Sequence, residues 1–238
     1  MRARAVLFDK DGTLFDFQKS WASWIGQEIA LISGGEPKLS AEIAAAVGFD
    51  PETGMILPDS PAIAGTEWDV ARVMLPFVPG MALEDLVTRL HATAAALIPV
   101  EVLPLVPFLA QLAAMDLYLG VATNDSEAAA RKHLRIHGVV DMFDFVAGYD
   151  SGHGAKPGPG MCMAFAQACR VPAHEVIMVG DSLHDLHAGR AAGMQTVAVL
   201  TGVARSDDLR GHADVVFRIS GIWPGGFPSA TETSGSRT

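Results

Sequence analysis

The stretch AVLFDKDGTL, residues 5–14, decides the expected fold. The apolar run Ala5–Phe8 leads directly into Asp9, and Asp11 follows two positions later. A short apolar run bounded by a glycine predicts a buried strand. Alternation along that strand puts Asp9 and Asp11 on one side, where the strand ends. Two carboxylates this close repel each other unless a positive group lies between them. Mg²⁺, a hard cation with oxygen ligands, is the usual solution.

A second interpretation of the same stretch is a solvated acidic turn that merely ends the strand. Gly12 fits either interpretation. It allows the backbone to turn sharply, and it also allows the backbone to approach a ligand closely. The rest of the chain decides between the two, because short motifs also occur by chance.

The composition limits the classes of protein that this chain can belong to. With 238 residues, half of them hydrophobic, it is long enough for one domain, or a domain with an insertion, around a full core. The formal net charge is −10 and the pI is near 5.1. A nucleic-acid-binding surface would need a basic face, so that class is disfavoured. A phosphate site would need local cations.

Cysteine usage and hydropathy favour a cytoplasmic protein. Cys162 and Cys169 fall on one face of an expected helix, where they cannot form a disulfide with each other. We expect both to be free core thiols. The N-terminus leads directly into a strand without the apolar segment of a signal peptide. We expect no membrane partner, because no apolar stretch is long and uninterrupted enough to span a bilayer.

Residues 16–97 form a helical insertion without a strand signal, according to the periodicity of their apolar side chains. Thr66 and Asp69 have the spacing of a capping box. The expected helices run from about 17 to 32, 40 to 47, 66 to 74, and 83 to 97. We predict that residues 1–15 and 98–220 form the main domain and that the tail, 221–238, is flexible because it is rich in Gly, Pro, Ser and Thr.

After Leu103 expected strands and helices alternate. This order predicts an α/β fold, a doubly wound parallel sheet with helices on both faces. One expected helix starts near 105, one follows Asn124 up to His137, and one covers 161–170. A further short helix carries Asp185 and ends near Gly193. The expected strands are 117–122, 143–147, 176–179, 196–200 and 215–219.

Polar side chains come at the ends of four strands or in the loops that follow them. They are Asp9 and Asp11, then Thr123 and Asn124, then Lys156, and then Asp181 with Asp185. Ligands of open α/β sheets bind beyond the carboxyl ends of the strands, so this series predicts one site. Thr123 and Asn124 could instead cap the next helix, and Lys156 could be an ordinary surface lysine.

In these segments the chain resembles the haloacid dehalogenase superfamily. The matching motifs are DKDGTL at 9–14, ATN at 122–124, Lys156-Pro157, and GDSLHD at 180–185. The resemblance extends to about residue 219. It implies a Rossmann-like core and identifies the insertion as a small α-helical cap. Among members with a cap, the chain is most similar to the phosphoglycolate phosphatase-like group.

The resemblance implies a Mg²⁺-dependent phosphatase that acts on a small phosphorylated metabolite, possibly phosphoglycolate, through an aspartyl-phosphate. Asp9 would be the nucleophile and Asp11 the general acid and base. Haloacid dehalogenases proper lack the second aspartate, so Asp11 favours phosphate chemistry over halide chemistry.

The remaining roles also follow from the resemblance. Gly12, Thr123, Asn124 and Lys156 would bind the phosphoryl group, and Lys156 would offset its charge in the transition state. Asp181 would hold Mg²⁺ together with a carboxylate oxygen of Asp9 and the backbone carbonyl of Asp11. Asp185 would support that metal site or Lys156.

Three alternative functions stay open from the sequence. A phosphomutase of the same superfamily is one, although Thr13 leans weakly to hydrolysis. A phospho-accepting signalling module is another, but it would accept phosphate on a later strand and would have no purpose for the insertion. A catalytically silent binding protein is disfavoured because no motif residue is missing. Within the cap, we expect Arg72 or Arg89 to set substrate choice.

Overall fold

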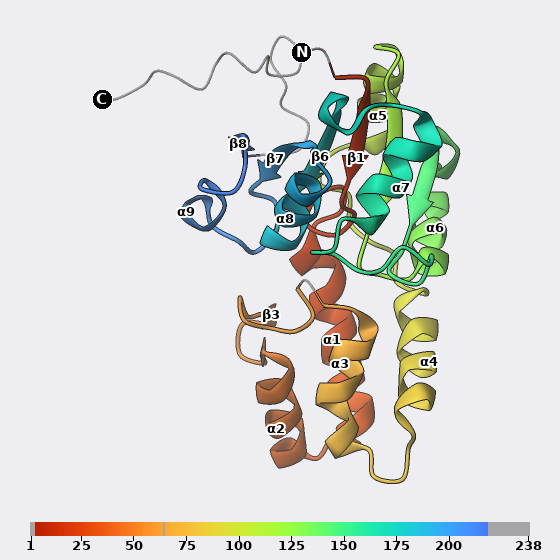
Figure 1. The fold of residues 1–238 in the computed structure, drawn as a ribbon. Helices are drawn as coiled ribbons and strands as arrows, with labels where there is room; N and C mark the ends of the chain where they lie inside the picture. Colours follow the sequence, from red (N-terminus) through yellow and green to blue (C-terminus); the bar gives the residue numbers. More distant parts are fainter. Residues whose placement is uncertain (1–2, 64, 219–238) are drawn as a thin grey trace.

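The computed structural model describes residues 3–63 and 65–218, which form a parallel six-stranded sheet with helices on both faces and a helical cap (Figure 1). The sheet order is β5-β4-β1-β6-β7-β8, and every pair of neighbours is parallel. This is the expected doubly wound α/β fold. The strands are β1 (Ala5–Phe8), β4 (Tyr118–Ala122), β5 (Phe145–Ala147), β6 (Val176–Gly180), β7 (Gln195–Val199) and β8 (Val215–Phe217).

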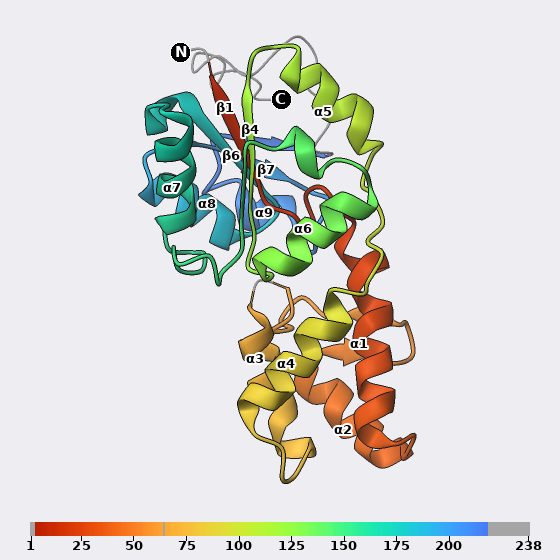
Figure 2. The same ribbon diagram turned by 90° about the vertical axis from the view of Figure 1, so that its right-hand side faces the viewer.

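Alternate residues of β1 enter two different hydrophobic clusters, which is why the strand reads as continuously apolar. Val6 and Phe8 pack with helices α5 and α6, whereas Ala5 and Leu7 pack with α7 and α8. Figure 2 shows these two pairs of helices on opposite faces of the sheet. Their bounds are α5 (Leu105–Ala113), α6 (Glu127–Ile136), α7 (Gly160–Cys169) and α8 (Leu183–Ala191), and the short α9 covers Ser206–Leu209.

The path of the chain places the polar strand ends together. From β1 the chain adds β4 and β5 on one side, and then returns to add β6, β7 and β8 on the other. The strand order therefore reverses at β1, and ligands of such sheets bind at this reversal, beyond the carboxyl ends. The register of the strands agrees with a single site, because Phe8 pairs with Val121 of β4 and with Val179 of β6. The polar residues that follow β1, β4 and β6 therefore begin at the same height along the sheet.

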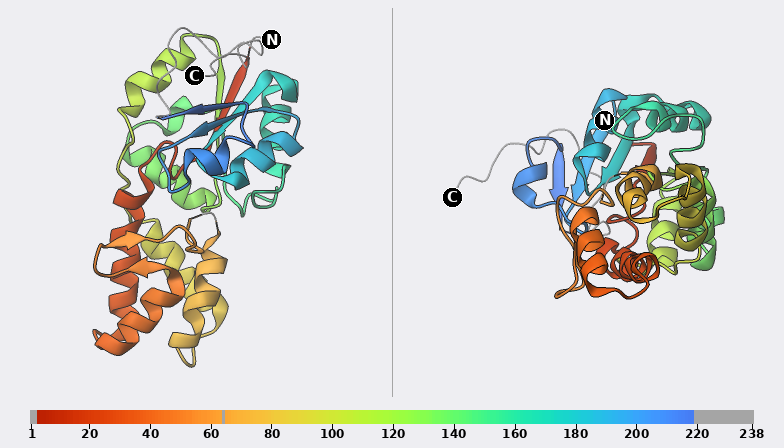
Figure 3. Two further views of the ribbon diagram at one scale, coloured as in Figure 1. Left: turned by 90° about the vertical axis from the view of Figure 1, so that its left-hand side faces the viewer. Right: turned by 90° about the horizontal axis from the view of Figure 1, so that it is seen from below.

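The cap has its own hydrophobic cluster, drawn from Phe17 to Ala94, and it lies beyond the end of the sheet where β1 stops (Figure 3). The first helix begins where the Asp16 carboxylate accepts a hydrogen bond from the Lys19 amide, and it ends at Gly34, whose φ is +60°. The cap helices are α1 (Phe17–Ser33), α2 (Pro37–Val47), α3 (Glu67–Met74) and α4 (Leu83–Ala94).

The expectation that the insertion contains no strand is wrong. Two short strands, β2 (Phe49–Asp50) and β3 (Met55–Ile56), pair antiparallel. Each has two residues, which is too short to produce an apolar alternation that could be seen in the sequence. The expected capping pair is present, because Asp69 accepts hydrogen bonds from the Thr66 amide and hydroxyl, both at 2.8 Å.

Three further expectations concern burial and the ends of the chain. Cys162 and Cys169 are free and buried, as expected. Among residues 3–63 and 65–218, the helices are all too short or too polar to cross a bilayer. The predicted flexible tail, 221–238, lies outside the described residues, and so does the last residue of the final predicted strand.

Candidate active site

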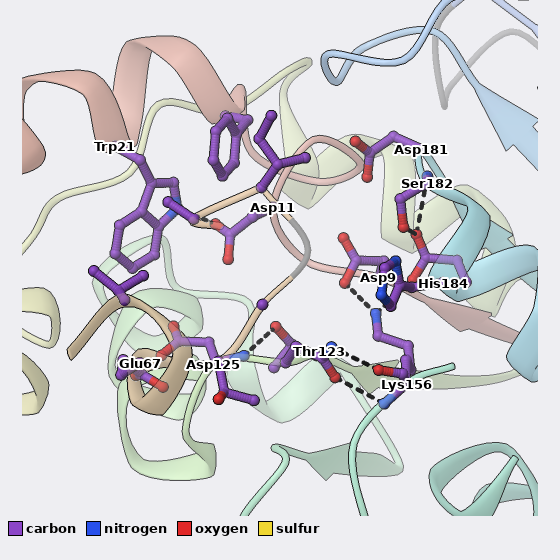
Figure 4. Close-up of a pocket in the computed structure, with 18 of the residues that line it drawn as sticks. Asp9, Asp11, Trp21, Glu67, Thr123, Asp125, Lys156, Asp181, Ser182 and His184 are labelled. Atoms are coloured by element: carbon purple, nitrogen blue, oxygen red, sulfur yellow. Dashed lines mark hydrogen bonds and ion pairs between the residues drawn. The ribbon is translucent and has the colours of Figure 1, made fainter. Parts of the chain in front are cut away.

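Lys156 joins two aspartates at the carboxyl end of the sheet. Its Nζ lies 2.5 Å from Oδ1 of Asp9 and 2.5 Å from Oδ1 of Asp185, and it also donates to the carbonyl of Ala122 at 2.8 Å (Figure 4). The other oxygen of Asp185 accepts hydrogen bonds from the amide and hydroxyl of Ser182. Lys156 is 95% buried (5% exposed), so it is not the surface lysine of the alternative interpretation.

Burial and charge shift the pKa values in this cluster in opposite directions. Burial raises the pKa of Asp9 to about 7, although Lys156 acts to lower it. Burial alone would lower the pKa of Lys156, but Asp185 and Asp9 raise it above its ordinary value. Lys156 is therefore charged at neutral pH, and it is the group that stabilises ionised Asp9.

Asp181 completes a compact acidic group. Carboxylate oxygens of Asp9, Asp181 and Asp185 lie within 4.8 Å of one another. Burial, and then the charges of Asp9 and Asp185, raise the pKa of Asp181. The backbone makes room for its carboxylate, because a Cβ at either Gly12 or Gly202 would overlap Asp181. Three buried carboxylates and one lysine leave an excess of negative charge, which an oxygen-seeking cation would balance.

The Asp11 side chain is held apart from this acidic group. Its Oδ1 accepts a hydrogen bond of 2.8 Å from the indole nitrogen of Trp21 in α1, and its Oδ2 lies 2.5 Å from Nζ of Lys10. Asp11 is not among the carboxylates that lie within 4.8 Å of one another, although its charge acts to raise the pKa of Asp9. The contact with Trp21 links Asp11 to the cap.

Thr123 and Asn124 lie at the site, but neither caps helix α6. Ser126 does so, accepting a hydrogen bond from the Ala129 amide. Thr123 is 2% exposed, and its hydroxyl accepts a hydrogen bond from the Asp125 amide. The Asn124 side chain pairs in both directions with the Lys156 backbone, at 3.0 and 2.9 Å. Asn124 thus holds the Lys156 loop, a contact that the sequence did not indicate.

Lys10 is fully buried and forms a second polar centre beside the acidic group. Besides Asp11, its Nζ lies 3.0 Å from Oδ2 of Asp125 and 3.2 Å from Nδ1 of His133. His133 is itself 0% exposed, and its other ring nitrogen lies 3.1 Å from the carbonyl of Ala94, the last residue of α4. Burial, and then the charge of Lys10, lower the pKa of His133 to about 4.

His133 makes the folded chain sensitive to acid. Because its pKa is about 4 when folded and near 6.5 when unfolded, the unfolded chain binds the extra proton between these values. Stability is therefore lost as pH falls from 7 to 5, by about 2 kcal/mol from this group alone. We expect the loss of unfolding free energy over this interval, measured by urea titration, to be smaller by about that amount in His133→Gln. Equal losses in both proteins would contradict this account.

A pocket lies over the acidic group, between the sheet and the cap. Its empty space, counted together with the open mouth, is about 620 Å³. From the sheet it is lined by Asp9, Asp11, Thr123, Asn124, Asp125, Lys156, Asp181, Ser182, His184 and Asp185. From the cap it is lined by Phe17, Trp21, Trp24, Ala62, Ile63, Gly65, Thr66, Glu67 and Val70.

The two cap arginines that were expected to set substrate choice lie elsewhere. Arg72 is exposed and pairs with Asp69 at 3.0 Å, and Arg89 pairs with Glu28 at 2.5 Å. Neither lines the pocket. Instead the pocket is lined by Trp21, which its helical spacing indicated as a core residue, and by Glu67, which the sequence did not single out. Only the folding of the cap over the sheet brings them there.

Comparison with known proteins supports the same family as the motifs. The family model described as haloacid dehalogenase-like hydrolase matches residues 6–199. The chain is 37% identical over 103 residues to the tyrosine-protein kinase PtkA of Mycobacterium tuberculosis, covering 42% of this chain and 35% of that protein. It is 37% identical over 97 residues to the phosphoglycolate phosphatase of Rhodospirillum rubrum, covering 41% of this chain and 40% of that protein.

The whole fold also has counterparts among solved structures. A haloacid dehalogenase-like hydrolase from Bacteroides fragilis superposes with a TM-score of 0.69 at 19% identity, covering 92% of this chain and 99% of the other. At this identity the likeness concerns the fold. The chain spans well under half the length of the two relatives described above, so their names do not fix its activity.

Proposed function

Because the chain belongs to the haloacid dehalogenase-like hydrolase family, we propose that it is a Mg²⁺-dependent phosphatase that hydrolyses a small phosphomonoester. One observation carries this proposal. Asp9, Lys156, Asp181 and Asp185 meet under a pocket at the reversal of the sheet. A carboxylate nucleophile, a fixed cation and an acidic metal site are the parts that phosphoryl transfer through a carboxylate needs.

Asp9 is the proposed nucleophile. Its carboxylate attacks phosphorus, the bond from phosphorus to the leaving oxygen breaks, and an aspartyl-phosphate forms. Lys156 holds Oδ1 of Asp9 at 2.5 Å and is itself fixed by Asp185 and by the Ala122 carbonyl. This fixed positive charge stabilises the phosphoryl oxygens as negative charge develops on them.

Asp11 is the proposed general acid and base. It lines the pocket on the side of the cap, where Trp21 and Lys10 hold its two oxygens. It would give a proton to the leaving alcohol, and then take one from the water that hydrolyses the aspartyl-phosphate. The contact with Trp21 makes the orientation of Asp11 dependent on the position of the cap.

The residues present fit a magnesium ion. Three buried carboxylates with oxygens within 4.8 Å offer the hard ligands that Mg²⁺ prefers. Asp9, Asp181 and the backbone carbonyl of Asp11 would hold it, while Asp185, whose oxygens bind Lys156 and Ser182, supports the cluster. When bound, the ion would offset the charge of the phosphoryl group.

The cap, residues 16–97, would close the pocket over the substrate and exclude water from the nucleophile. We propose it as a unit separate from the core of 1–15 and 98–220, since its hydrophobic cluster consists almost entirely of its own residues. Phosphoglycolate is one substrate to test, because one matched relative is named a phosphoglycolate phosphatase. The free, buried cysteines fit the cytoplasmic location expected from the sequence.

Phosphate release from a panel of small phosphomonoesters tests the proposal, measured with Mg²⁺ and again with excess EDTA. We expect turnover of at least one compound with Mg²⁺, loss of at least about 100-fold in EDTA, and recovery when Mg²⁺ is restored. Turnover that EDTA leaves unchanged would contradict the proposed dependence on Mg²⁺. Transfer of the phosphoryl group to a sugar instead of water would make the chain a phosphomutase.

A further inference from the structure

The cap closes the pocket with a wall of apolar side chains, which we call the cap wall. They come from helices α1 and α3 and from the loop before α3, and they are Phe17, Trp21, Trp24, Ala62, Ile63 and Val70. The rings of Trp21 and Trp24 pack edge to face, with their centroids 5.3 Å apart. The pocket thus has carboxylates and Lys156 on the side of the sheet and hydrocarbon on the side of the cap.

The two indole nitrogens of the cap wall already have partners. Nε1 of Trp21 donates to Oδ1 of Asp11 at 2.8 Å (Figure 4), and Nε1 of Trp24 donates to the hydroxyl of Thr93 at 3.1 Å. An indole has this one donor and no acceptor. Both tryptophans therefore offer only carbon to a substrate.

Other polar groups on the cap side of the pocket are used within the cap itself. The hydroxyl and the amide of Thr66 both donate to Oδ2 of Asp69, each at 2.8 Å. In the loop before Thr66, three amides of the pocket lining donate to acceptors in the same loop, and they are those of Ala62, Ile63 and Gly65. These donors are not available to a hydroxyl or carboxylate on the substrate.

Glu67 lies behind the cap wall and does not offer its charge to the pocket. Both of its carboxylate oxygens have less than 1 Å² of exposed surface. They contact the Asp125 carboxyl, and Oε2 lies 3.6 Å from Nε2 of His91. Burial, and then Glu67 against the opposing charge of Lys10, raise the pKa of Asp125 well above its ordinary value. Asp125 therefore keeps a proton that it can share with Glu67.

The polar side chains of the sheet gather at the phosphoryl end of the pocket. Lys156 is the single lysine or arginine among the described lining residues, and it is held by Asp9 and Asp185. The Ser182 hydroxyl donates to Asp185 at 2.6 Å. Burial lowers the pKa of His184, and the largest charge effects on it come from Asp185 and Lys156, so His184 belongs to the same cluster. No lysine or arginine of the described lining is left to face the cap wall.

We propose that the chain acts on phosphomonoesters whose leaving alcohol is uncharged and ends in hydrocarbon, which packs against the cap wall. The inference rests on the proposed phosphatase function and names its substrate class. The phosphoryl group lies against Asp9 and Lys156, and the hydrocarbon end lies against the cap. A hydroxyl or a charge at that end would lose its hydration there and gain no partner. Phosphoglycolate is therefore expected to be a poor substrate.

Four phosphomonoesters of nearly equal size test this preference: propyl phosphate, 2-hydroxyethyl phosphate, phosphoethanolamine and phosphoglycolate. We expect wild-type kcat/KM for propyl phosphate to exceed that for 2-hydroxyethyl phosphate by about 10- to 100-fold, with both charged compounds slower still. Intrinsic reactivity cannot produce this order, because the hydroxyl compound has the more acidic leaving alcohol. A wild-type enzyme that prefers any of the three polar compounds would overturn the inference and leave the phosphatase function intact.

The variant Val70→Thr keeps the shape of the side chain and places a hydroxyl in the cap wall. We expect the kcat/KM ratio of propyl to 2-hydroxyethyl phosphate to fall by about 3- to 10-fold, the size of one neutral hydrogen bond. Ile63→Thr, at a half-buried loop position, tests the same wall if Val70→Thr does not fold. The matched control is Val73→Thr in the same helix but outside the pocket lining, which should keep the wild-type ratio. An unchanged ratio in folded Val70→Thr and Ile63→Thr would overturn the inference.

Binding separates this inference from a failure of the chemistry. In Asp9→Asn, where turnover is blocked, calorimetry gives the Kd of propyl phosphate and of 2-hydroxyethyl phosphate. We expect propyl phosphate to bind about 10-fold or more tightly. If no compound is hydrolysed by the wild type yet this binding preference is present, the phosphatase proposal fails and the apolar site stands. Equal Kd values, or tighter binding of the hydroxyl compound, would overturn the apolar site.

Discussion

Replacing Asp9 with asparagine is expected to reduce phosphate release by a factor on the order of 10⁴ or more, because the group that attacks phosphorus is lost. Asparagine has almost the same shape and carries no charge. Since burial raises the pKa of Asp9, an uncharged side chain there avoids the cost of burying a carboxylate. Lys156 keeps its partner Asp185. The fold should therefore be retained, with an unfolding midpoint at least as high as that of the wild type.

The matched control is Asp59→Asn, which changes an exposed aspartate of the cap outside the pocket lining. It should keep the wild-type rate. Circular dichroism and urea unfolding check that both variants are folded. Substantial turnover by folded Asp9→Asn, purified free of wild-type enzyme, would refute Asp9 as the nucleophile.

Replacing Lys156 with methionine is expected to damage both activity and stability. Methionine keeps the length of the side chain but leaves Asp9 and Asp185 facing each other without a cation. Breaking a buried ion pair on one side costs about 3 kcal/mol or more, and loss of the fixed charge should lower turnover by about 10²–10³-fold. Urea unfolding at pH 7 in EDTA measures the stability change without metal.

The exposed lysine of α2 provides the control for this measurement. Lys38 pairs with Glu42 at 3.9 Å, with a side chain that is 85% exposed, so Lys38→Met should change stability by less than about 0.5 kcal/mol. The deficit of Lys156→Met should shrink at pH 5, where protonation relieves the repulsion between the carboxylates. A Lys156→Met protein as stable as Lys38→Met would show that Lys156 is not the cation that the cluster depends on.

The fold and the inner part of the site could be predicted because both follow from local patterns. The run Ala5–Phe8 is apolar at every position, as a strand buried on both faces requires. The polar residues that follow such strands must meet, since parallel strands end at one edge of the sheet. These patterns alone therefore predict that Asp9, Lys156 and Asp181 lie in one site.

The outer part of the site could not be predicted, because it depends on tertiary packing. Trp21 is 9% exposed and belongs to the cap cluster, as its helical spacing indicated, but its indole nitrogen also reaches Asp11. Glu67 looks like an ordinary first-turn glutamate until the cap is folded over the sheet. The expectation that Arg72 or Arg89 would set substrate choice relied on their charge alone. The sequence does not show that each arginine forms an ion pair with an acidic residue away from the pocket.

Lys10 illustrates a different limit. It lies between Asp9 and Asp11, where the sequence indicates only a charged residue in a polar turn. In the structure it is fully buried and holds Asp11 and Asp125. No spacing rule predicts this, because the partner Asp125 follows another strand of the sheet. A lysine directly between two candidate catalytic carboxylates was the one available signal.

Direct capture of the intermediate tests the central claim, that Asp9 receives the phosphoryl group. The wild-type enzyme is mixed with the phosphomonoester that it hydrolyses fastest, quenched in acid within one turnover, and reduced with borohydride, which converts an aspartyl-phosphate to homoserine. The account predicts homoserine at position 9, found by peptide mass spectrometry, and none in a sample without substrate. Steady turnover with unmodified Asp9, or with the modification at another aspartate, would contradict it.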